Sequence, residues 1–135
     1  MIVDSRGTPL AVLLRPANEH DSVAFEAVLD AVRPIRQRRG RPRRRPSKVH
    51  ADKAYDFERC REACRRRHIV PRIARRGVES KTRLGRHRWV VERTFAWLHR
   101  FRRLLVRYER RADIHQAFLT LGCALLCWNA IQRFC

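Results

Sequence analysis

A large excess of positive charge restricts the kinds of protein that this sequence can form. Lys and Arg number 32 against 13 Asp and Glu, so the formal net charge is +19 over 135 residues. Such an excess destabilises a compact state by self-repulsion unless a polyanion neutralises it. Nearly all the cations are Arg, whose planar guanidinium group suits phosphate oxygens. The charge therefore favours a nucleic-acid-binding protein over one that binds a membrane surface.

The remaining composition indicates a folded, cytoplasmic domain. Hydrophobic residues make up 44% of the chain, too many for a disordered basic tail, and the length suits one domain with a modest core. The N-terminus shows no signal-peptide pattern. The apolar stretch 117–131 is interrupted by Asn129 and is short for a bilayer span, which predicts a buried helix. An odd number of cysteines without a CxxC pair favours a reducing compartment.

The order of the predicted elements is that of an α/β domain. Helix-linked strands imply parallel pairing and the opening pair should be antiparallel, so we expect a mixed sheet flanked by helices. Asp113 and Gln116 form a predicted capping box at the last helix. The apolar stripe of that helix is Ile114, Ala117, Phe118, Leu121, Leu125, Trp128 and Ile131. Strands are predicted at 2–4, 10–14, 48–51 and 69–74, and helices at 22–32, 57–67, 89–108 and 113–133.

Residues 34–47 form a predicted basic loop that cannot pack a core. Its segment Arg39-Gly40-Arg41-Pro42 has the form of an AT-hook, an arm that inserts Arg side chains into a narrow minor groove. The alternative is a loop that contacts phosphates without sequence preference. Both interpretations predict salt-dependent DNA binding through Arg39, Arg41, Arg43, Arg44 and Arg45.

The predicted helix 89–108 carries a polar stripe around a carboxylate. Counting from just before it, Arg88, Glu92, Ala96, His99 and Arg103 are spaced by four, four, three and four residues and should share one face. Taken alone, such a stripe is typical of a solvated face with ordinary i,i+4 ion pairing.

Asp52 stands at the end of a predicted strand, just before a turn. An Asp in this place can simply cap the turn, but the ends of strands also present functional side chains. Paired with Glu92 in so cationic a chain, it suggests phosphodiester chemistry, in which two divalent ions are held by carboxylates. Because Mg²⁺ and similar hard ions prefer oxygen ligands, we expect Asp52 and Glu92 to bind Mg²⁺ or Mn²⁺.

These motifs resemble those of bacterial insertion-sequence DDE transposases, most closely the insertion sequence five group. Residues 51–56, Ala-Asp-Lys-Ala-Tyr-Asp, resemble the second-aspartate motif, and residues 88–98 resemble the helix bearing the catalytic glutamate. Residues 18–21, 102–104 and 107–110 match as well, so the resemblance covers nearly the whole chain. It implies an RNase H-like fold with three acidic metal ligands, of which Asp52 would be the second and Glu92 the third.

The resemblance also shows departures from the family pattern. In its Tyr-Arg-Glu-Lys motif, Arg88 matches the Arg, whereas Gly85 takes the Tyr place and His99 the Lys place. The first aspartate is expected on a strand before Met1, and Asp4 lies at the far end of the next strand. We therefore expect an N-terminally truncated domain, spanning 1–135, that lacks its first strand.

The expected function is DNA transposition by metal-dependent strand cleavage and transfer at insertion-sequence ends. This chain alone is expected to be inactive because the first Asp is missing, with Arg88, His99 and Arg103 contacting DNA. The alternative is a non-catalytic DNA-binding transposase remnant or regulator. Expected partners are the transposon ends, the target DNA, the product of an upstream reading frame and a second copy of the chain, in the cytoplasm at the nucleoid.

Two further sets of residues have competing interpretations. Cys60, Cys64 and His68 are spaced by four residues, as are Cys123 and Cys127. A zinc site needs four converging ligands, and buried thiols are the favoured interpretation. Trp89, Trp97 and Trp128 could stack on bases, but their apolar helix faces favour core packing.

Overall fold

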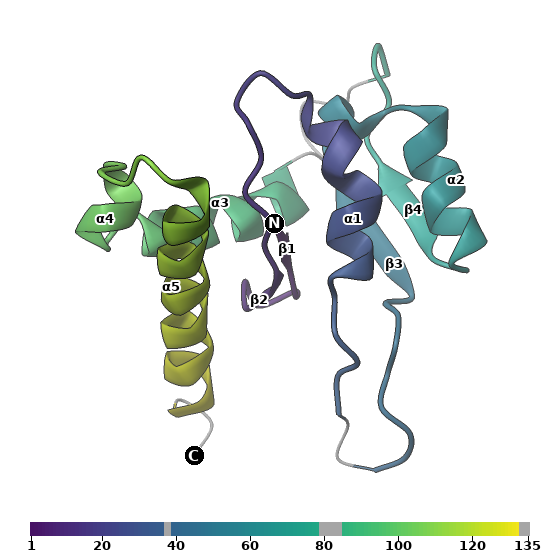
Figure 1. Ribbon diagram of the computed structural model, residues 1–135. Coiled ribbons are helices and arrows are strands. Elements are labelled where there is room, and N and C mark those ends of the chain that lie inside the picture. The colour runs from purple at the N-terminus through teal and green to yellow at the C-terminus, as the bar shows by residue number, and fades with distance from the viewer. Residues whose placement is uncertain (37–38, 79–84, 133–135) are drawn as a thin grey trace. The chain divides into compact units, whose positions relative to one another are not determined.

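The computed structural model describes residues 1–36, 39–78 and 85–132, with only the backbone of 85–88. The chain divides into two compact units (Figure 1). Unit 1 combines Met1–Leu14 with Trp89–Cys135, and unit 2 is Arg15–Arg88. Both units contain helices and strands, which confirms the predicted α/β character.

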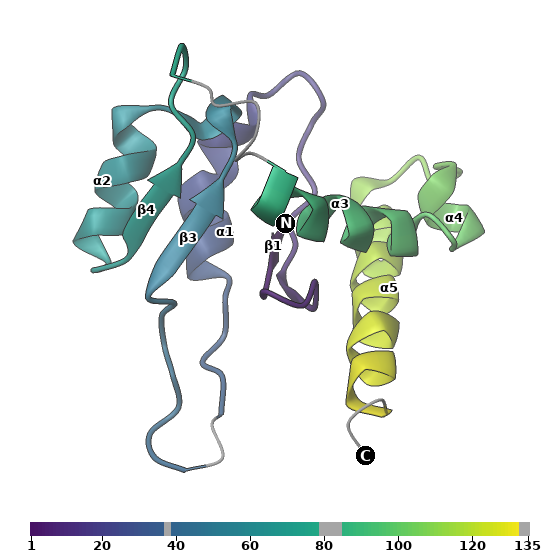
Figure 2. The same ribbon diagram turned by 180° about the vertical axis from the view of Figure 1, so that it is seen from behind.

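Unit 2 contains a parallel strand pair covered by helices. Strand β3 (Lys48–Ala51) pairs with β4 (Val70–Ile73), and α2 (Glu58–Arg66) connects them. The 3-10 turn η1 (Asp21–Ala24) leads into α1 (Phe25–Asp30). Figures 1 and 2 show α1 and α2 on the same face of the strand pair. The parallel pairing predicted from the helical connection is confirmed.

The core of unit 2 forms because α2 is apolar on one side only. Cys60, Ala63 and Cys64 are spaced to lie on one helical face, and all three are buried. Among the described residues of this unit, the other buried apolar side chains are Phe25, Val28, Leu29, Ile69 and Ile73. Helix α2 ends at Arg66, and His68, the residue after its C-cap Arg67, has a left-handed φ of 53°. The bonds from His68 N to Arg65 O (2.8 Å) and from Ile69 N to Cys64 O (2.9 Å) complete a Schellman motif.

Ion pairs join α1 to α2. The guanidinium group of Arg67 bonds to both oxygens of Asp30, each at 2.8 Å, and reaches Glu26 at 3.2 Å. Arg66 bonds to Glu26 at 2.9 Å. The hydrogen bond from Arg67 lowers the pKa of Asp30 below the usual range of an aspartate. Part of the arginine excess therefore stabilises the fold itself.

Unit 1 begins with a hairpin. Strand β1 (Ile2–Val3) pairs antiparallel with β2 (Pro9–Ala11), as predicted. Asp4 Oδ1 accepts hydrogen bonds from the backbone N–H groups of Arg6 and Thr8, both at 2.8 Å. Gly7 has a φ of +85°, which the turn requires and which glycine adopts without strain. The Asp4 carboxylate thus stabilises the hairpin turn.

The prediction of one continuous helix over 89–108 is wrong. Helix α3 (Gly85–Leu98) ends first, and α4 (Arg102–Leu105) follows after a turn. Phe101, between the two helices, has an extended backbone (φ −81°, ψ 114°) that interrupts the helix. Around this turn, Leu98, Phe101 and Leu104 all pack over Gly122 of α5 (Ala112–Gln132), where an added Cβ would lie 3.2, 3.5 and 2.8 Å from them.

The prediction that the last helix is buried is also wrong. The only buried residues of α5 are Gly122 and Cys123. Five members of the predicted stripe are instead between 41% and 58% exposed: Ile114, Leu121, Leu125, Trp128 and Ile131. With 21 residues, α5 is by length and composition able to cross a membrane, contrary to the expectation from its apolar stretch.

Long-range contacts also replace two predicted local features. Gln116 does not form the predicted capping box, because its Oε1 accepts from the backbone N–H of Leu14 (2.7 Å) and its Nε2 donates to Thr120 (3.3 Å). Within the described ranges, the strands form two separate pairs rather than the single mixed sheet expected.

Candidate functional site

Asp52 follows β3 directly and caps the next turn, η2 (Lys53–Tyr55). Its Oδ1 accepts a hydrogen bond from the backbone N–H of Ala54 at 2.9 Å, so the capping interpretation is confirmed. In the described part of the chain, Oδ2 accepts no hydrogen bond. A carboxylate has enough lone pairs to cap a turn with one oxygen and bind a ligand with the other. Capping therefore leaves a functional role open.

Basic side chains surround Asp52. A pocket of about 640 Å³ is lined by His20, Asp52, Lys53, Ala54, Arg76 and Gly77. Three of these residues are basic and one is a carboxylate. Such a pocket can hold an anionic group beside a carboxylate.

Tyr55 ends the turn that Asp52 caps and is partly buried. Its ring packs against Phe25 with centroids 5.6 Å apart. Burial raises the pKa of Tyr55 to about 12, and the carboxylates of Asp21 and Asp52 contribute. The phenol therefore stays neutral at physiological pH, and two acidic groups from η1 and η2 act on the same ring.

Glu92 lies on the exposed side of α3, whose opposite face is buried at Val90, Thr94 and Leu98. Thr94 Oγ1 donates to the carbonyl oxygen of Gly7 at 2.8 Å and lies 3.0 Å from that of Val90. These contacts fix the rotation of α3, and the rotation in turn presents Glu92 outward.

The two predicted metal ligands belong to different units. Asp52 is in unit 2 and Glu92 is in unit 1. That the two carboxylates bind the same metal ions therefore stays a prediction. Within residues 1–36, 39–78 and 85–132, no group of three or more His, Cys, Asp or Glu side chains could hold a metal ion. The available oxygen of Asp52 does suit a hard divalent cation.

The predicted polar stripe is interrupted where α3 ends. Arg103 lies on α4, where it donates to Glu109 at 2.6 Å and its guanidinium carbon lies 5.1 Å from the centroid of the Phe118 ring. This hydrogen bond is the main reason that the pKa of Glu109 is lowered. His99 follows α3 with its ring centroid 6.5 Å from that of Phe95. The side chain of Arg88 lies outside the described atoms, and the predicted DNA contacts of all three stay predictions.

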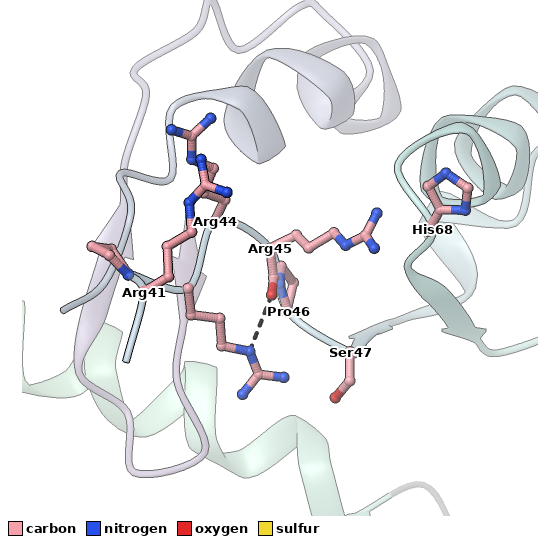
Figure 3. Close-up of a pocket in the computed structure, with 8 residues that line it drawn as sticks. Arg41, Arg44, Arg45, Pro46, Ser47 and His68 are labelled. Atoms are coloured by element: carbon pink, nitrogen blue, oxygen red, sulfur yellow. Dashed lines mark hydrogen bonds between the residues drawn. The ribbon is translucent and has the colours of Figure 1, made fainter. Parts of the chain in front are cut away.

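The basic loop is an ordered hairpin over its described residues. Ile35 and Arg43 exchange two backbone hydrogen bonds, of 2.9 and 2.8 Å. Arg45 donates to the carbonyl oxygen of Arg67 at the end of α2 (3.2 Å), where the helix dipole favours a cation. The dashed line in Figure 3 marks the bond from Arg43 Nε to Arg45 O, of 3.1 Å. We call residues 35–36 and 39–45 the basic hairpin.

The basic hairpin opens onto a second pocket. Figure 3 shows Arg45 extending toward His68, while Arg41 and Arg44 lie along the loop. The pocket, of about 700 Å³, is lined by residues 41–47 and His68. Arg39, Arg41 and Arg44 are exposed, and in the described ranges their side chains form no ion pair. Their guanidinium groups are available to phosphate.

The remaining sequence predictions have mixed outcomes. Cys60, Cys64 and Cys123 are buried, which confirms the expected buried thiols at these positions, whereas Cys127 is half-buried. Burial raises the pKa of Cys123 to about 11. Trp89 and Trp128 are exposed, so core packing is wrong for these two rings. Trp89 and Trp97 instead enclose the guanidinium carbon of Arg93, at 4.2 and 4.8 Å from the ring centroids.

Comparisons with known proteins decide the family. The sequence profile of the family described as "Transposase DDE domain" matches residues 1–128. This chain belongs to the DDE transposase family. It is 55% identical over 133 residues to a Burkholderia cepacia protein described as "Putative transposase for insertion sequence element IS402". The match covers 98% of this chain and 63% of that protein. No solved structure matches. The predicted resemblance to insertion-sequence transposases is confirmed.

The sequence did not predict two basic residues of the pocket around Asp52, which we call the Asp52 pocket. In a DDE transposase both are candidates for contacting the substrate. His20 belongs to the matching segment 18–21 but received no role, and Arg76 lies in a stretch expected to be a polar loop. Both line the Asp52 pocket. Only the packing of η1 beside η2, and of the segment after β4, brings them to Asp52.

Proposed function

We propose that this chain forms part of the catalytic core of a transposase that cuts and joins DNA at insertion-sequence ends with divalent metal ions. The main support is the Asp52 carboxylate: one oxygen caps a turn, and the other accepts no hydrogen bond from the described residues and lies in a pocket lined by basic residues. A pocket of this composition can accommodate a metal ligand and a phosphate together. Membership of the DDE transposase family supports the same reaction.

Asp52 and Glu92 would be two of the metal ligands, for Mg²⁺ or Mn²⁺. When bound, a pair of such ions activates the attacking oxygen and stabilises the leaving oxygen. The family implies an RNase H-like fold for the whole catalytic domain. In that fold Asp52 and Glu92 would share the ions.

The basic hairpin would bind DNA, both the transposon ends and the target. Arg39, Arg41 and Arg44 are exposed, and a formal charge of +19 favours a polyanionic partner. Each phosphate contact releases a counterion, so the affinity should fall steeply with salt. We further propose that the protein acts at the nucleoid in the cytoplasm, with a second copy of the chain as partner.

The isolated chain is proposed to bind DNA without cutting it. The reaction needs three carboxylates by family resemblance, and Asp4 already accepts two backbone hydrogen bonds in the hairpin turn. A third ligand would come from another segment, such as the product of an upstream reading frame. Without that ligand, the alternative role of a DNA-binding regulator applies to this chain.

Mn²⁺ tests whether the two carboxylates share a site. Substoichiometric Mn²⁺ added to the ¹⁵N-labelled chain should broaden the amide signals around Asp52 and Glu92 together. Asp52→Asn should reduce the broadening at Glu92, and Glu92→Gln should reduce it at Asp52. Asp113→Asn is the matched control, because it removes the same charge at a carboxylate that pairs with Arg111 and does not line the pocket. Independent broadening of the two sites would overturn the shared metal site.

A separate binding measurement tests the basic hairpin. The triple variant Arg39→Ala/Arg41→Ala/Arg44→Ala should bind duplex DNA at least about tenfold more weakly, with a salt slope reduced by about 2 to 3. Arg65→Ala is the control for lost charge, because Arg65 is ion-paired to Glu58. An unchanged salt slope in the triple variant would contradict the proposed role of the basic hairpin.

A further inference from the structure

One aromatic ring organises the basic side of the Asp52 pocket. The Phe57 ring meets the His20 ring edge-on, with centroids 5.3 Å apart. The guanidinium carbon of Arg76 lies 4.9 Å from the Phe57 centroid, and that of Arg59 lies 5.1 Å from it. Cation–π attraction holds each Arg near the ring. His20 and Arg76 therefore have defined positions although both are exposed.

The contacts of His20 determine which ring nitrogen carries its proton. Nδ1 accepts a hydrogen bond from the backbone N–H of Ser22 (3.2 Å) and lies 2.8 Å from Ser22 Oγ. Ser22 is 3% exposed, and Arg59 donates to its hydroxyl oxygen. Because Nδ1 acts as an acceptor, the neutral imidazole carries its proton on Nε2. His20 thus presents an N–H donor on the side of the ring away from its cap.

Arg76 is held by its backbone and its Nε. Its backbone N–H donates to Asp56 Oδ2 at 2.9 Å, and its Nε donates to the carbonyl oxygen of Lys53 at 3.3 Å. The terminal nitrogens make no hydrogen bond in the part of the chain that the structure describes. A guanidinium group fixed at Nε and open at its terminal nitrogens is oriented for an oxyanion.

We propose that the Asp52 pocket binds one backbone phosphate of a DNA strand, with His20 Nε2 and the terminal nitrogens of Arg76 as donors. This inference rests on the proposed function, and it identifies the strand's contact beside the metal-binding carboxylate. The pocket, of about 640 Å³, holds a phosphate with parts of its flanking sugars. His20 and Arg76 are positioning residues for the strand.

The charge of the Asp52 carboxylate gives the proposed phosphate site a further testable property. In the absence of a divalent cation, its negative charge in the same pocket opposes an anion. Asp52→Asn should therefore strengthen phosphate binding in EDTA, since Asn keeps the turn cap through its side-chain oxygen. Loss of a basic residue from the pocket should have the opposite effect.

The test measures the affinity of a fluorescent ten-nucleotide single strand for the full chain by anisotropy, in EDTA and over a salt series. Arg76→Ala should weaken binding about fivefold and lower the salt slope by about 0.7. Arg75→Ala removes the same charge one residue away, outside the pocket, and should change affinity less than about twofold. Asp52→Asn should tighten binding about threefold.

Two further variants protect the test against misfolding. His20→Asn retains an oxygen acceptor for the Ser22 N–H and should weaken binding about threefold. Arg76→Lys retains the charge and should recover part of the affinity. The ¹⁵Nε2 signal of His20 should shift with the DNA strand in wild type and in Arg75→Ala, but not in Arg76→Ala.

The possible failures are distinguishable. Equal affinities for Arg76→Ala and Arg75→Ala, with an unmoved His20 signal, would overturn the phosphate site. If the basic hairpin variant still lost affinity in that case, the proposed DNA-binding function would stand. A wild-type chain that bound no DNA would overturn both.

Discussion

Asp52 and Glu92 belong to units that hold their carboxylates by different means. Asp52 is bonded to an amide two residues away, and its pocket is built from short turns around Phe57. Glu92 faces outward because Thr94, on the other side of α3, bonds to Gly7, 87 residues away. The placement of one carboxylate therefore depends on local structure and that of the other on distant packing.

The two units also use their side chains differently. In unit 2, arginines on α2 pair with acids on α1, and the apolar residues of α2 are buried beneath them. In unit 1, α5 buries a glycine and a cysteine but leaves large apolar side chains exposed. Single substitutions in the ion pairs of unit 2 should therefore change its free energy of unfolding little. Substitutions at the few close contacts of unit 1 should lower its free energy of unfolding strongly.

The largest effect is expected at Leu98, which is 1% exposed. Leu98→Ala should reduce the free energy of unfolding of unit 1 by about 2–5 kcal/mol through lost burial and a cavity. Trp89, Trp97 and Trp128 all lie in unit 1, so tryptophan fluorescence during urea unfolding reports on it. Leu105→Ala, at a residue 62% exposed, is the control. Equal losses for both variants would contradict the comparison.

Gly7→Ala should destabilise unit 1 by about 2 kcal/mol, from left-handed strain and a clash. Its φ is +85°, and an added Cβ would lie 2.9 Å from Thr94 Oγ1 and 3.2 Å from Arg93. Gly40→Ala is the matched control, because Gly40 has a φ of +87° and no atom of the described residues lies within 4 Å of a Cβ added there. Thermal unfolding should show that Gly7→Ala costs more than Gly40→Ala. An equal cost would mean that strain alone matters and that the Thr94 contact does not.

His68→Gly should stabilise unit 2 by about 1 kcal/mol, because glycine adopts the left-handed conformation at the end of α2 without steric cost. The measurement is urea unfolding followed by circular dichroism. His68 has a φ of 53°. His68→Ala keeps the strain and serves as the control. A destabilised glycine variant would show that the His68 side chain contributes contacts that outweigh the strain.

The smallest effect is expected for the Arg67–Asp30 pair and concerns acid stability. The pKa of Asp30 is lowered by its hydrogen bond to Arg67, so the pair stabilises the fold above the unfolded pKa of about 3.9. That contribution is lost as the pH falls through the lower folded pKa. Because Asp30 is largely exposed, the contribution of the pair to the free energy of unfolding should be below about 1 kcal/mol.

Arg67→Met should therefore flatten the fall in unfolding free energy between about pH 5 and pH 3. Arg65→Met, at a side chain 57% exposed, is the control for lost charge. A wild-type and an Arg67→Met profile that ran parallel through this range would show that the pair does not contribute.

Much of this protein could be read from short stretches of sequence. The order of strands and helices, the parallel and antiparallel pairs, the buried Cys60 and Cys64 and the capping role of Asp52 all follow from periodicity and turn chemistry. These features depend on patterns within one element or between two elements that follow each other along the chain. The family resemblance also came from short motifs, at residues 51–56 and 88–98, and the comparisons confirm it.

The tertiary structure decided what depends on distant partners. The turn after α3 brings Leu98, Phe101 and Leu104 over Gly122, which lies on α5, and Gln116 bonds with Leu14, 102 residues away, instead of forming its expected cap. His20 and Arg76 reach Asp52 only through the packing of separate turns. Local patterns specify which face of an element is apolar, but not which remote residue will cover it, since that choice depends on the packing of the whole unit.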